Sequence, residues 1–263
     1  VLGSIQPQPL AQNAAGEMAL ADIAGAIKPD DCHFARTRLL CLENTWNGNP
    51  MTTDYLARAT ALARERGLAV HLDGARLFNA AVATAAQGES VATAARRIAS
   101  HFDSVSVCFS KGLGAPVGSA MCGSKELIAR AHRIRKMAGG GMRQAGLLAA
   151  AATHALDHHL ERLANDHALA QRLALGLQGV QGLSVRSAQT NIVFVDVADG
   201  RGADLLAYLK QHGVLATGLI GLRFVTHLDV DAAGIDHTLH CIRRFFQEQA
   251  PGQTASTSGA GVY

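Results

Sequence analysis

The sequence has little of what several specialised classes of protein require. Its 263 residues include only 6 prolines and 5% aromatic residues, and no uncharged apolar run reaches the roughly 18 residues of a membrane span. The 24 Lys and Arg residues nearly balance the 21 Asp and Glu residues, which argues against nucleic acid as a partner. With 48% hydrophobic residues the chain has the composition of a packed core. We therefore expect a cytoplasmic protein without a nucleic-acid or membrane partner.

The cysteines and histidines also lack a clear disulfide or metal pattern. The five cysteines are odd in number and no two have CxxC spacing, which argues against a disulfide framework or a structural zinc site and fits a reducing compartment. His154 and His158 are four residues apart on an expected helix, a spacing that suits zinc. No third ligand with a clear geometry follows them. We therefore predict no metal site.

The first half of the chain alternates between apolar runs and helical patterns. Glycine is frequent, with 27 residues, as is typical of proteins with many tight strand-to-helix turns. The apolar run at 37–43 is typical of a strand buried on both faces. We expect further strands at 68–72 and 104–109, and helices at 17–28, 53–66 and 76–99. This alternation predicts an α/β fold with a mostly parallel sheet.

The second half of the chain predicts a smaller α+β unit. It begins with a long Ala- and Leu-rich helical pattern at 142–178. We then expect strands at 191–197 and 222–226 and helices at 203–211 and 231–249. The last residues are mostly small and polar. We expect a major domain over residues 1–155, a small C-terminal domain over 156–250 and a disordered tail over 251–263.

A lysine and an aspartate stand where neighbouring strands of the predicted sheet end. Asp73 follows the strand at 68–72 and Lys111 follows the strand at 104–109, a spacing that fits one strand–helix–strand crossover. Ligands of such sheets bind at the carboxyl ends of the strands. A partly desolvated lysine there becomes a nucleophilic amine, and a carboxylate can pair with a protonated pyridine nitrogen. Together they indicate a pyridoxal 5′-phosphate (PLP) site. The simpler alternatives are a solvated loop lysine and an aspartate that caps the next helix.

Basic residues near these strands offer a way to bind an anionic ligand. Arg76 lies three residues after Asp73, and Arg223 lies in the expected strand at 222–226. Either guanidinium can bind a substrate carboxylate through two hydrogen bonds, and either can equally form a surface salt bridge. A basic cluster at 130–136 runs into a triple glycine, a pattern that fits a solvated helix face or an anion site.

Several long motifs resemble one enzyme family. The low-specificity L-threonine aldolases, which are PLP-dependent enzymes of the aspartate-aminotransferase fold type (fold type I), are similar to this chain from Val1 to about Phe246. The motifs that carry the resemblance are QPQPL near the start, DDCHFARTRLLCLENT (30–45), HLDGARLFNAAVA (71–83), SVSVCFSKGLGAPVGSAMCGS (104–124), RKMAGGGMRQAG (135–146) and LRFVTHLD (222–229). Their number and order make the resemblance highly specific.

The resemblance implies roles for individual residues. Lys111 matches the lysine that forms a Schiff base with PLP, and Asp73 matches the partner of the pyridine nitrogen. Arg76 matches an arginine near the cofactor and the substrate, and Arg223 matches the arginine that binds the amino-acid carboxylate. His33 matches a histidine near the substrate side chain and is a candidate base. A structural role for His33 remains open, as do water, the cofactor phosphate or another histidine as the base.

The resemblance also implies an oligomer. Lys136 and Arg143 match basic residues that reach a phosphate or an active site across a subunit interface. Enzymes of this fold type place their active sites at a dimer interface. We therefore expect a homodimer or a homotetramer that acts on a small amino-acid substrate.

Two departures from the family bear on activity. Trp46 stands where close relatives have a histidine in the ENT-x-N-G motif, and a tryptophan there can stack or fill the pocket wall. Family members begin before the position of Val1, and their earlier segment holds the phosphate loop and the histidine that stacks on the pyridine ring. We therefore expect an N-terminally truncated family member.

Three functions remain open at this stage. The first is aldol cleavage of L-threonine, L-allo-threonine and related β-hydroxy-α-amino acids to glycine and an aldehyde. The second is a related PLP-dependent reaction on amino acids, such as β-elimination. The third is an inactive, truncated homologue that lacks the phosphate-binding loop.

Overall fold

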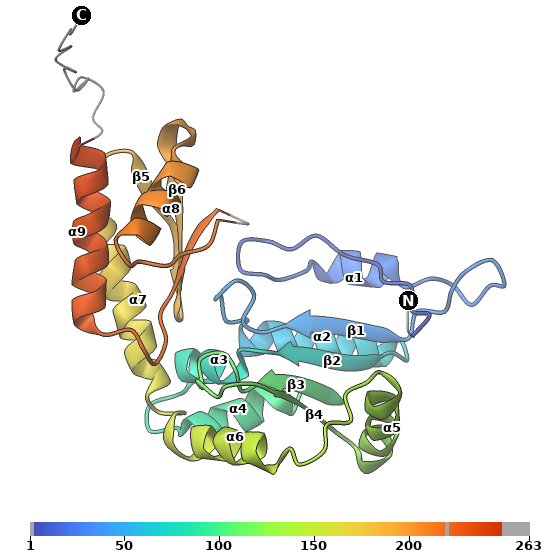
Figure 1. The fold of residues 1–263 in the computed structure, drawn as a ribbon. Coiled ribbons are helices and arrows are strands. Elements are labelled where there is room, and N and C mark those ends of the chain that lie inside the picture. The colour runs from blue at the N-terminus through green and yellow to red at the C-terminus, as the bar shows by residue number, and fades with distance from the viewer. Residues whose placement is uncertain (1–2, 219–220, 249–263) are drawn as a thin grey trace, which may run out of the picture. The chain divides into compact units, whose positions relative to one another are not determined.

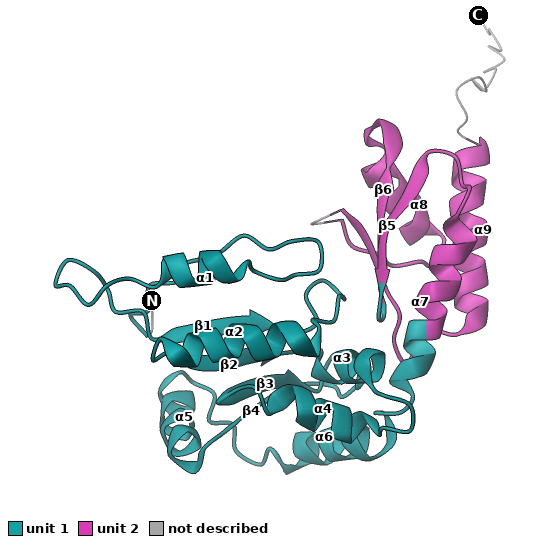
Figure 2. Cartoon of the chain, turned by 180° about the vertical axis from the view of Figure 1, so that it is seen from behind, with its two compact units in different colours: residues 1–167, 189–191 teal, residues 168–188, 192–263 magenta. Residues whose placement is uncertain are grey.

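The computed structural model describes residues 3–218 and 221–248, which form two compact units (Figures 1 and 2). Of the described residues, 3–167 and 189–191 form one unit, and 168–188, 192–218 and 221–248 form the other. The expected disordered tail at 251–263 lies outside the described residues.

A four-stranded mixed sheet forms the centre of the first unit. Its strands lie in chain order as β1 (Leu39–Glu43), β2 (Ala69–Gly74), β3 (Ser104–Cys108) and β4 (Ser119–Gly123). β1, β2 and β3 are parallel, as the sequence predicts, whereas β4 runs antiparallel to β3. β4 was not expected from the sequence. Only positions 109–118 separate β3 from β4, too few for the crossover that a parallel neighbour needs, so the chain returns as a hairpin.

Six helices belong to the first unit. They are α1 (Leu20–Ala26), α2 (Thr53–Glu65), α3 (Leu77–Thr84), α4 (Val91–Ala99), α5 (Lys125–Met137) and α6 (Gly146–His158). Side-chain caps set where several of them begin: the Thr52 hydroxyl accepts a hydrogen bond from the Tyr55 backbone N–H at α2, and Ser90 does the same for Thr93 at α4. The helix expected at 76–99 is divided into α3 and α4 by a break that contains Gly88.

The two faces of this sheet differ in burial. Leu40, Leu42 and Leu72 point into the main hydrophobic core, to which α1, α2, α3 and α4 also contribute. Cys41 and Glu43 on the other face are exposed, so β1 alternates between buried and exposed residues. The prediction that 37–43 is buried on both faces is therefore wrong. Within the described residues, the core covers only one face of β1.

The second unit is built on a three-stranded sheet. α7 (Leu163–Leu177) runs into this unit, followed by β5 (Leu183–Gln189), β6 (Ile192–Val197), a short 3₁₀ turn (Ala198–Gly200), α8 (Gly202–Gln211), β7 (Leu222–Val225) and α9 (Ala232–Glu248). The strand order is β5-β6-β7, and β6 and β7 are antiparallel. β5 was not expected from the sequence. Phe245 and Leu205 are fully buried in the core of this unit. Among the described residues, no helix combines the length and the apolar character that crossing a membrane requires.

Candidate active site

The carboxyl ends of three parallel strands gather charged residues at one edge of the sheet. Glu43 ends β1 and lies directly opposite Asp73 of β2. β2 pairs in turn with β3, which leads into the loop that contains Lys111. The prediction that the strands before Asp73 and Lys111 are neighbours is confirmed. Ligands of parallel sheets bind at this edge because the strand ends leave backbone groups and side chains facing solvent together.

Three charged residues near this edge influence the Glu43 carboxyl. Burial is the largest cause that raises the pKa of the Glu43 carboxyl, although this side chain sits on the exposed face, and the Asp73 carboxylate raises that pKa further. The positive charges of Arg76 and Lys111 lower the pKa of Glu43 in part. Asp73, Arg76 and Lys111 therefore all act on one carboxyl group. Sequence reasoning missed Glu43, although its place at the end of an apolar run marks it as a strand-end residue.

Asp73 is exposed and held in a local turn. Its Oδ1 accepts a hydrogen bond from the Ala75 backbone N–H at 3.0 Å. The helix that follows begins at Leu77, with Arg76 at the N-cap position. The alternative in which Asp73 caps the helix is therefore wrong. Its carboxylate instead lies at the strand edge and raises the pKa of the Cys41 thiol, after the larger effect of burial.

Lys111 is exposed on a loop whose backbone is held by hydrogen bonds. The Gly114 N–H donates to the Lys111 carbonyl at 2.9 Å, and the Ala115 N–H donates to the Phe109 carbonyl at 3.0 Å. Gly114 has φ +70°, in the left-handed region that glycine tolerates best. Leu113 is buried beneath the loop. The lysine amine is thus accessible while its backbone is fixed.

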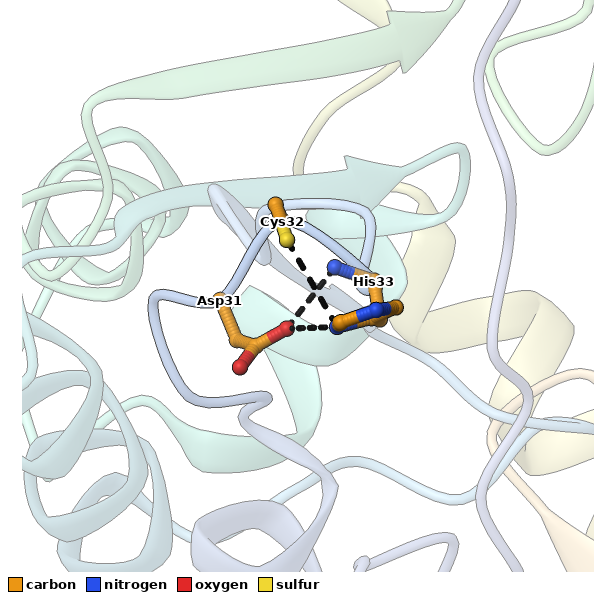
Figure 3. A group of neighbouring side chains, drawn as sticks. All are labelled: Asp31, Cys32 and His33. Carbon is orange, nitrogen blue, oxygen red and sulfur yellow. Dashed lines mark hydrogen bonds and ion pairs between the residues drawn. The ribbon is translucent and has the colours of Figure 1, made fainter.

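His33 lies in an exposed turn at some distance along the chain from these strands (Figure 3). Its Nδ1 is 2.6 Å from Asp31 Oδ1, and its backbone N–H donates to the same oxygen at 2.8 Å. These two hydrogen bonds lower the pKa of Asp31. Cys32 Sγ is 3.5 Å from the same Nδ1. The interactions of His33 are thus with its own turn, and its role near the substrate stays a prediction.

The turn at His33 brings three potential metal ligands together. Asp31, Cys32 and His33 are exposed, and their ligand atoms lie within 4.8 Å of one another (Figure 3). Two ligands of a tetrahedral zinc ion would be about 3.3 Å apart, given the usual bond lengths of about 2.0 Å. The 2.6 Å between Asp31 and His33 is shorter and is the distance of a hydrogen bond. The three residues are adjacent in sequence, and their geometry is that of a hydrogen-bonded turn.

Lys136 and Arg143 lie at the end of α5 and in the turn after it. Both are exposed, and α5 has no buried residue. The Lys136 side chain lies over Gly141, where an added Cβ would come within 2.5 Å of Lys136 Cδ. The neighbouring basic residues Arg130 and Arg133 are also exposed, as expected for a solvated helix face. A role for Lys136 or Arg143 across a subunit interface stays a prediction.

Arg223 belongs to β7 in the second unit. It lies opposite Phe194 of β6 and is half-buried. Its Nε is buried and has no hydrogen-bond partner among the described residues. A buried guanidinium N–H without a partner is costly, and a bound carboxylate would satisfy it. The predicted role of Arg223 in binding a carboxylate is compatible with this observation and remains untested.

Trp46 is half-buried in a tight turn after β1. Its backbone exchanges two hydrogen bonds with Asn49, at 2.8 and 3.0 Å. An added Cβ on Gly16 would lie 2.6 Å from Trp46 Cβ, so the tryptophan packs closely on the Gly16 backbone. The preceding Asn44 and Thr45 are almost fully buried. Trp46 thus forms part of a wall beside the end of β1.

The α/β fold matches solved structures of a threonine aldolase and a serine palmitoyltransferase. The structure of Leishmania major threonine aldolase matches with a TM-score of 0.72 at 21% identity, over 89% of this chain and 69% of that one. A variant of serine palmitoyltransferase from S. paucimobilis, solved with a bound PLP–myriocin aldimine, matches with a TM-score of 0.61 at 18% identity, over 87% of this chain and 57% of that one.

The sequence comparisons narrow this fold to a family. Residues 1–200 match the beta-eliminating lyase family. The low-specificity L-threonine aldolase of Escherichia coli K12 is 48% identical over 230 residues, which are 88% of this chain and 67% of the relative. Low-specificity L-threonine aldolase 1 of Arabidopsis thaliana is 36% identical over 96% of this chain and 72% of the relative. The chain belongs to the beta-eliminating lyase family, among the low-specificity L-threonine aldolase sequences. It spans about two thirds of the length of these relatives.

Proposed function

We propose that this chain uses PLP to cleave the Cα–Cβ bond of L-threonine, L-allo-threonine and related β-hydroxy-α-amino acids, giving glycine and an aldehyde. The observation that carries the proposal is the group of charged residues at the strand edge, where Asp73, Arg76 and Lys111 all act on Glu43. PLP enzymes use a lysine that forms a Schiff base and a carboxylate that pairs with the pyridine nitrogen, and both kinds of residue stand at this edge. The relatives named as threonine aldolases support the substrate class.

The residues at this edge fit PLP on electrostatic grounds. Glu43 and Asp73 are direct neighbours in register, and their like charges help to raise the pKa of Glu43. A protonated pyridine nitrogen beside Asp73 would relieve this repulsion, because it adds a positive charge between two carboxylates. Asp73 Oδ1 is used by Ala75, and its second oxygen is the one that would face the ring nitrogen. Lys111 would hold the aldehyde carbon of the cofactor.

Each residue then has a defined task. PLP, when bound, supplies an electron sink for the charge that develops at the substrate Cα. Asp73 would keep the pyridine nitrogen protonated, and Lys111 would hold the cofactor through its amine. Arg223, helped by Arg76, would bind the substrate carboxylate and so orient the Cα–Cβ bond for cleavage.

His33 is the proposed acceptor of the β-hydroxyl proton. The contact between its Nδ1 and the Asp31 carboxylate favours the tautomer with the proton on Nδ1, because a carboxylate only accepts. In the neutral ring with this tautomer, the His33 Nε2 carries no proton and can accept one. The histidine side chain is 81% exposed, so a substrate can reach it.

We further propose that the chain acts as a homodimer or homotetramer. The segment that carries Lys136 and Arg143 also exposes the large apolar side chains of Ile134, Met137 and Met142. Clustered apolar side chains of this size mark a surface that another protein covers. Light scattering on a dilution series tests this proposal, and a monomer at all concentrations would contradict it.

The cofactor proposal is tested by trapping. The chain is incubated with PLP, reduced with borohydride and digested, and the peptides are analysed by mass spectrometry. We expect one phosphopyridoxyl group, located on Lys111, and none in Lys111→Ala. Labelling spread over other lysines, with Lys111 unlabelled, would overturn the proposed cofactor site.

The reaction proposal is tested with threonine. Acetaldehyde and glycine in equal amounts are expected for aldol cleavage. Formation of 2-oxobutyrate and ammonia would instead identify an elimination. A chain that forms the Lys111 adduct and converts threonine to neither set of products would contradict the proposed reaction while leaving the cofactor site intact.

A further inference from the structure

The loop that follows Lys111 is held from the side by residues of two helices. An added Cβ on Gly112 would lie 3.0 Å from the Asn79 side-chain Oδ1 of α3 and 2.9 Å from a methyl carbon of Leu163 in α7. Both distances are shorter than ordinary van der Waals contact. A side chain at position 112 would therefore require Asn79 or Leu163 to shift, so the Gly112 backbone packs closely against both side chains.

Asn79 is itself held by a histidine. It is 2% exposed, and its Nδ2 lies 3.1 Å from Nε2 of His167. Burial lowers the pKa of His167 to about 4, so the ring is neutral at pH 7. A neutral imidazole can accept through Nε2, and the amide nitrogen of Asn79 donates to it. The hydrogen bond thus fixes which end of the Asn79 amide faces Gly112.

A second histidine holds the next residue of the loop. His159 Nδ1 lies 2.6 Å from the Leu113 carbonyl oxygen, and because a carbonyl only accepts, the imidazole is the donor. The Leu113 side chain packs with Leu163 and Ala155 in a small apolar cluster. The backbone of residues 112–113 is therefore held by a glycine contact, a hydrogen bond and a buried side chain.

We propose that Asn79 and His167 form a positioning pair for Lys111, in which the neutral His167 orients the Asn79 amide and Asn79 sets the position of Gly112. Neither side chain touches the amine. The pair sets the path of the loop that carries Lys111 after β3, and thereby the position of the amine relative to Asp73. The inference rests on the proposed role of Lys111 in holding PLP.

Substitutions at His167 separate orientation from simple packing. His167→Gln keeps an acceptor, because the Gln Oε1 can replace the imidazole Nε2. His167→Leu introduces an apolar side chain of similar length and leaves the Asn79 N–H without an acceptor. His158→Gln is the matched control, since His158 is exposed at the end of α6.

Two measurements are made on the full chain. The first is hydrogen exchange at the amides of Gly114 and Ala115 without PLP, with the amides of α2 as an internal control for folding. The second is the rate at which Lys111 acquires a borohydride-reducible adduct with PLP, followed by mass spectrometry. We expect His167→Leu to raise exchange in the loop and to slow the adduct about tenfold, with α2 unchanged. His167→Gln and His158→Gln should match the wild type in both.

Each outcome decides one question. A His167→Leu chain that matches the wild type in loop exchange and in adduct rate overturns the positioning pair, and so does a His167→Gln chain that behaves like His167→Leu. The wild type could form no adduct on Lys111 while His167→Leu alone raises exchange in the loop. In that case the proposed cofactor role of Lys111 fails, and Asn79 and His167 are confirmed only as a support of the loop. If His167→Leu does not fold, Gly112→Ala replaces it, because the added methyl group would crowd the Asn79 side chain, and we expect it to slow the adduct. A wild-type adduct rate in that variant overturns the proposal.

Discussion

Glu43 and Asp73 lie directly opposite one another on parallel neighbouring strands, each at the carboxyl end of its strand. Two carboxylates in this relation repel each other, and the pKa of Glu43 is raised by burial and by Asp73. The electrostatic repulsion between the two carboxylates is unfavourable without a ligand, and a cation bound between them would make the arrangement favourable. It therefore links the register of two strands to the chemistry that the strand edge can support.

The first prediction concerns Glu43→Gln. The pKa of Glu43 is raised in the folded chain, so the folded state binds this proton more tightly than the unfolded state does. The stability that this gives is present below the ordinary pKa of 4.5 and is lost as the pH rises from 4.5 through the raised value. Glu43→Gln removes this loss. We expect it to be more stable than the wild type at pH 7, by less than about 1 kcal/mol because the group is partly solvated, and equal to it at pH 3. Urea unfolding at both pH values measures the difference.

Glu161→Gln serves as the control for this prediction. Glu161 is exposed in the turn before α7, away from the end of β1. Its substitution should leave the difference between pH 3 and pH 7 as in the wild type. A Glu43→Gln chain less stable than the wild type at pH 7 would show that the Glu43 charge is stabilising.

The second prediction concerns Lys111. Lys111→Arg keeps the positive charge that acts on Glu43 but removes the nucleophilic amine. We expect it to fold like the wild type and to lose threonine cleavage by at least about a thousandfold, as is common when a covalent catalytic group is removed. Acetaldehyde release, coupled to an alcohol dehydrogenase, measures the loss. Retention of a tenth of the wild-type rate would remove Lys111 from the proposed mechanism.

The third prediction concerns the pH dependence of stability through His167. Burial lowers its pKa from 6.5 to about 4, so between these values the unfolded chain binds a proton that the folded chain does not. Stability is therefore present above pH 6.5 and is lost as the pH falls towards 4, by up to about 3 kcal/mol. The difference between wild type and His167→Gln isolates this contribution, because the other histidines are common to both. A difference that does not change between pH 7 and pH 4.5 would contradict the burial of this ring.

The fourth prediction concerns Gly16 and Trp46. Gly16 has φ +83°, and an added Cβ would overlap Trp46. Gly67 has φ +73° with open space around it. We expect Gly67→Ala to cost about 1 kcal/mol from backbone strain alone and Gly16→Ala to cost at least about 1 kcal/mol more. Trp46→Ala should recover part of the excess in the double variant, as thermal unfolding would show. Equal costs at the two glycines would mean that Trp46 moves aside freely.

The fifth prediction concerns Arg223. If its guanidinium binds the substrate carboxylate, Arg223→Lys keeps the charge and loses the two-point hydrogen bond. We expect KM for threonine to rise about tenfold, with a smaller fall in kcat from poorer alignment of the Cα–Cβ bond. The amount of PLP trapped on Lys111 should not change, since that step does not involve the substrate. Unchanged steady-state kinetics would place Arg223 outside the site.

The family and most of the elements follow from local sequence patterns. The spacing between Asp73 and Lys111 predicted neighbouring strands, and the pairing of β2 with β3 confirms this. Apolar periodicity also located most of the helices of both units. β4 and β5 escaped prediction because both contain many small or polar residues, and β4 is mostly exposed, so neither forms a clear apolar run.

The sequence by itself determined the chemistry that is present: a lysine and an aspartate after apolar runs, within motifs of one enzyme family. Only the tertiary structure decided what lies beside them. Strand pairing set Glu43 against Asp73, and helix packing brought Asn79 and its neutral histidine partner under the Lys111 loop. The reason is physical: side-chain type and local periodicity depend on neighbours in the chain, whereas pKa values and close contacts depend on burial and on residues far apart in sequence.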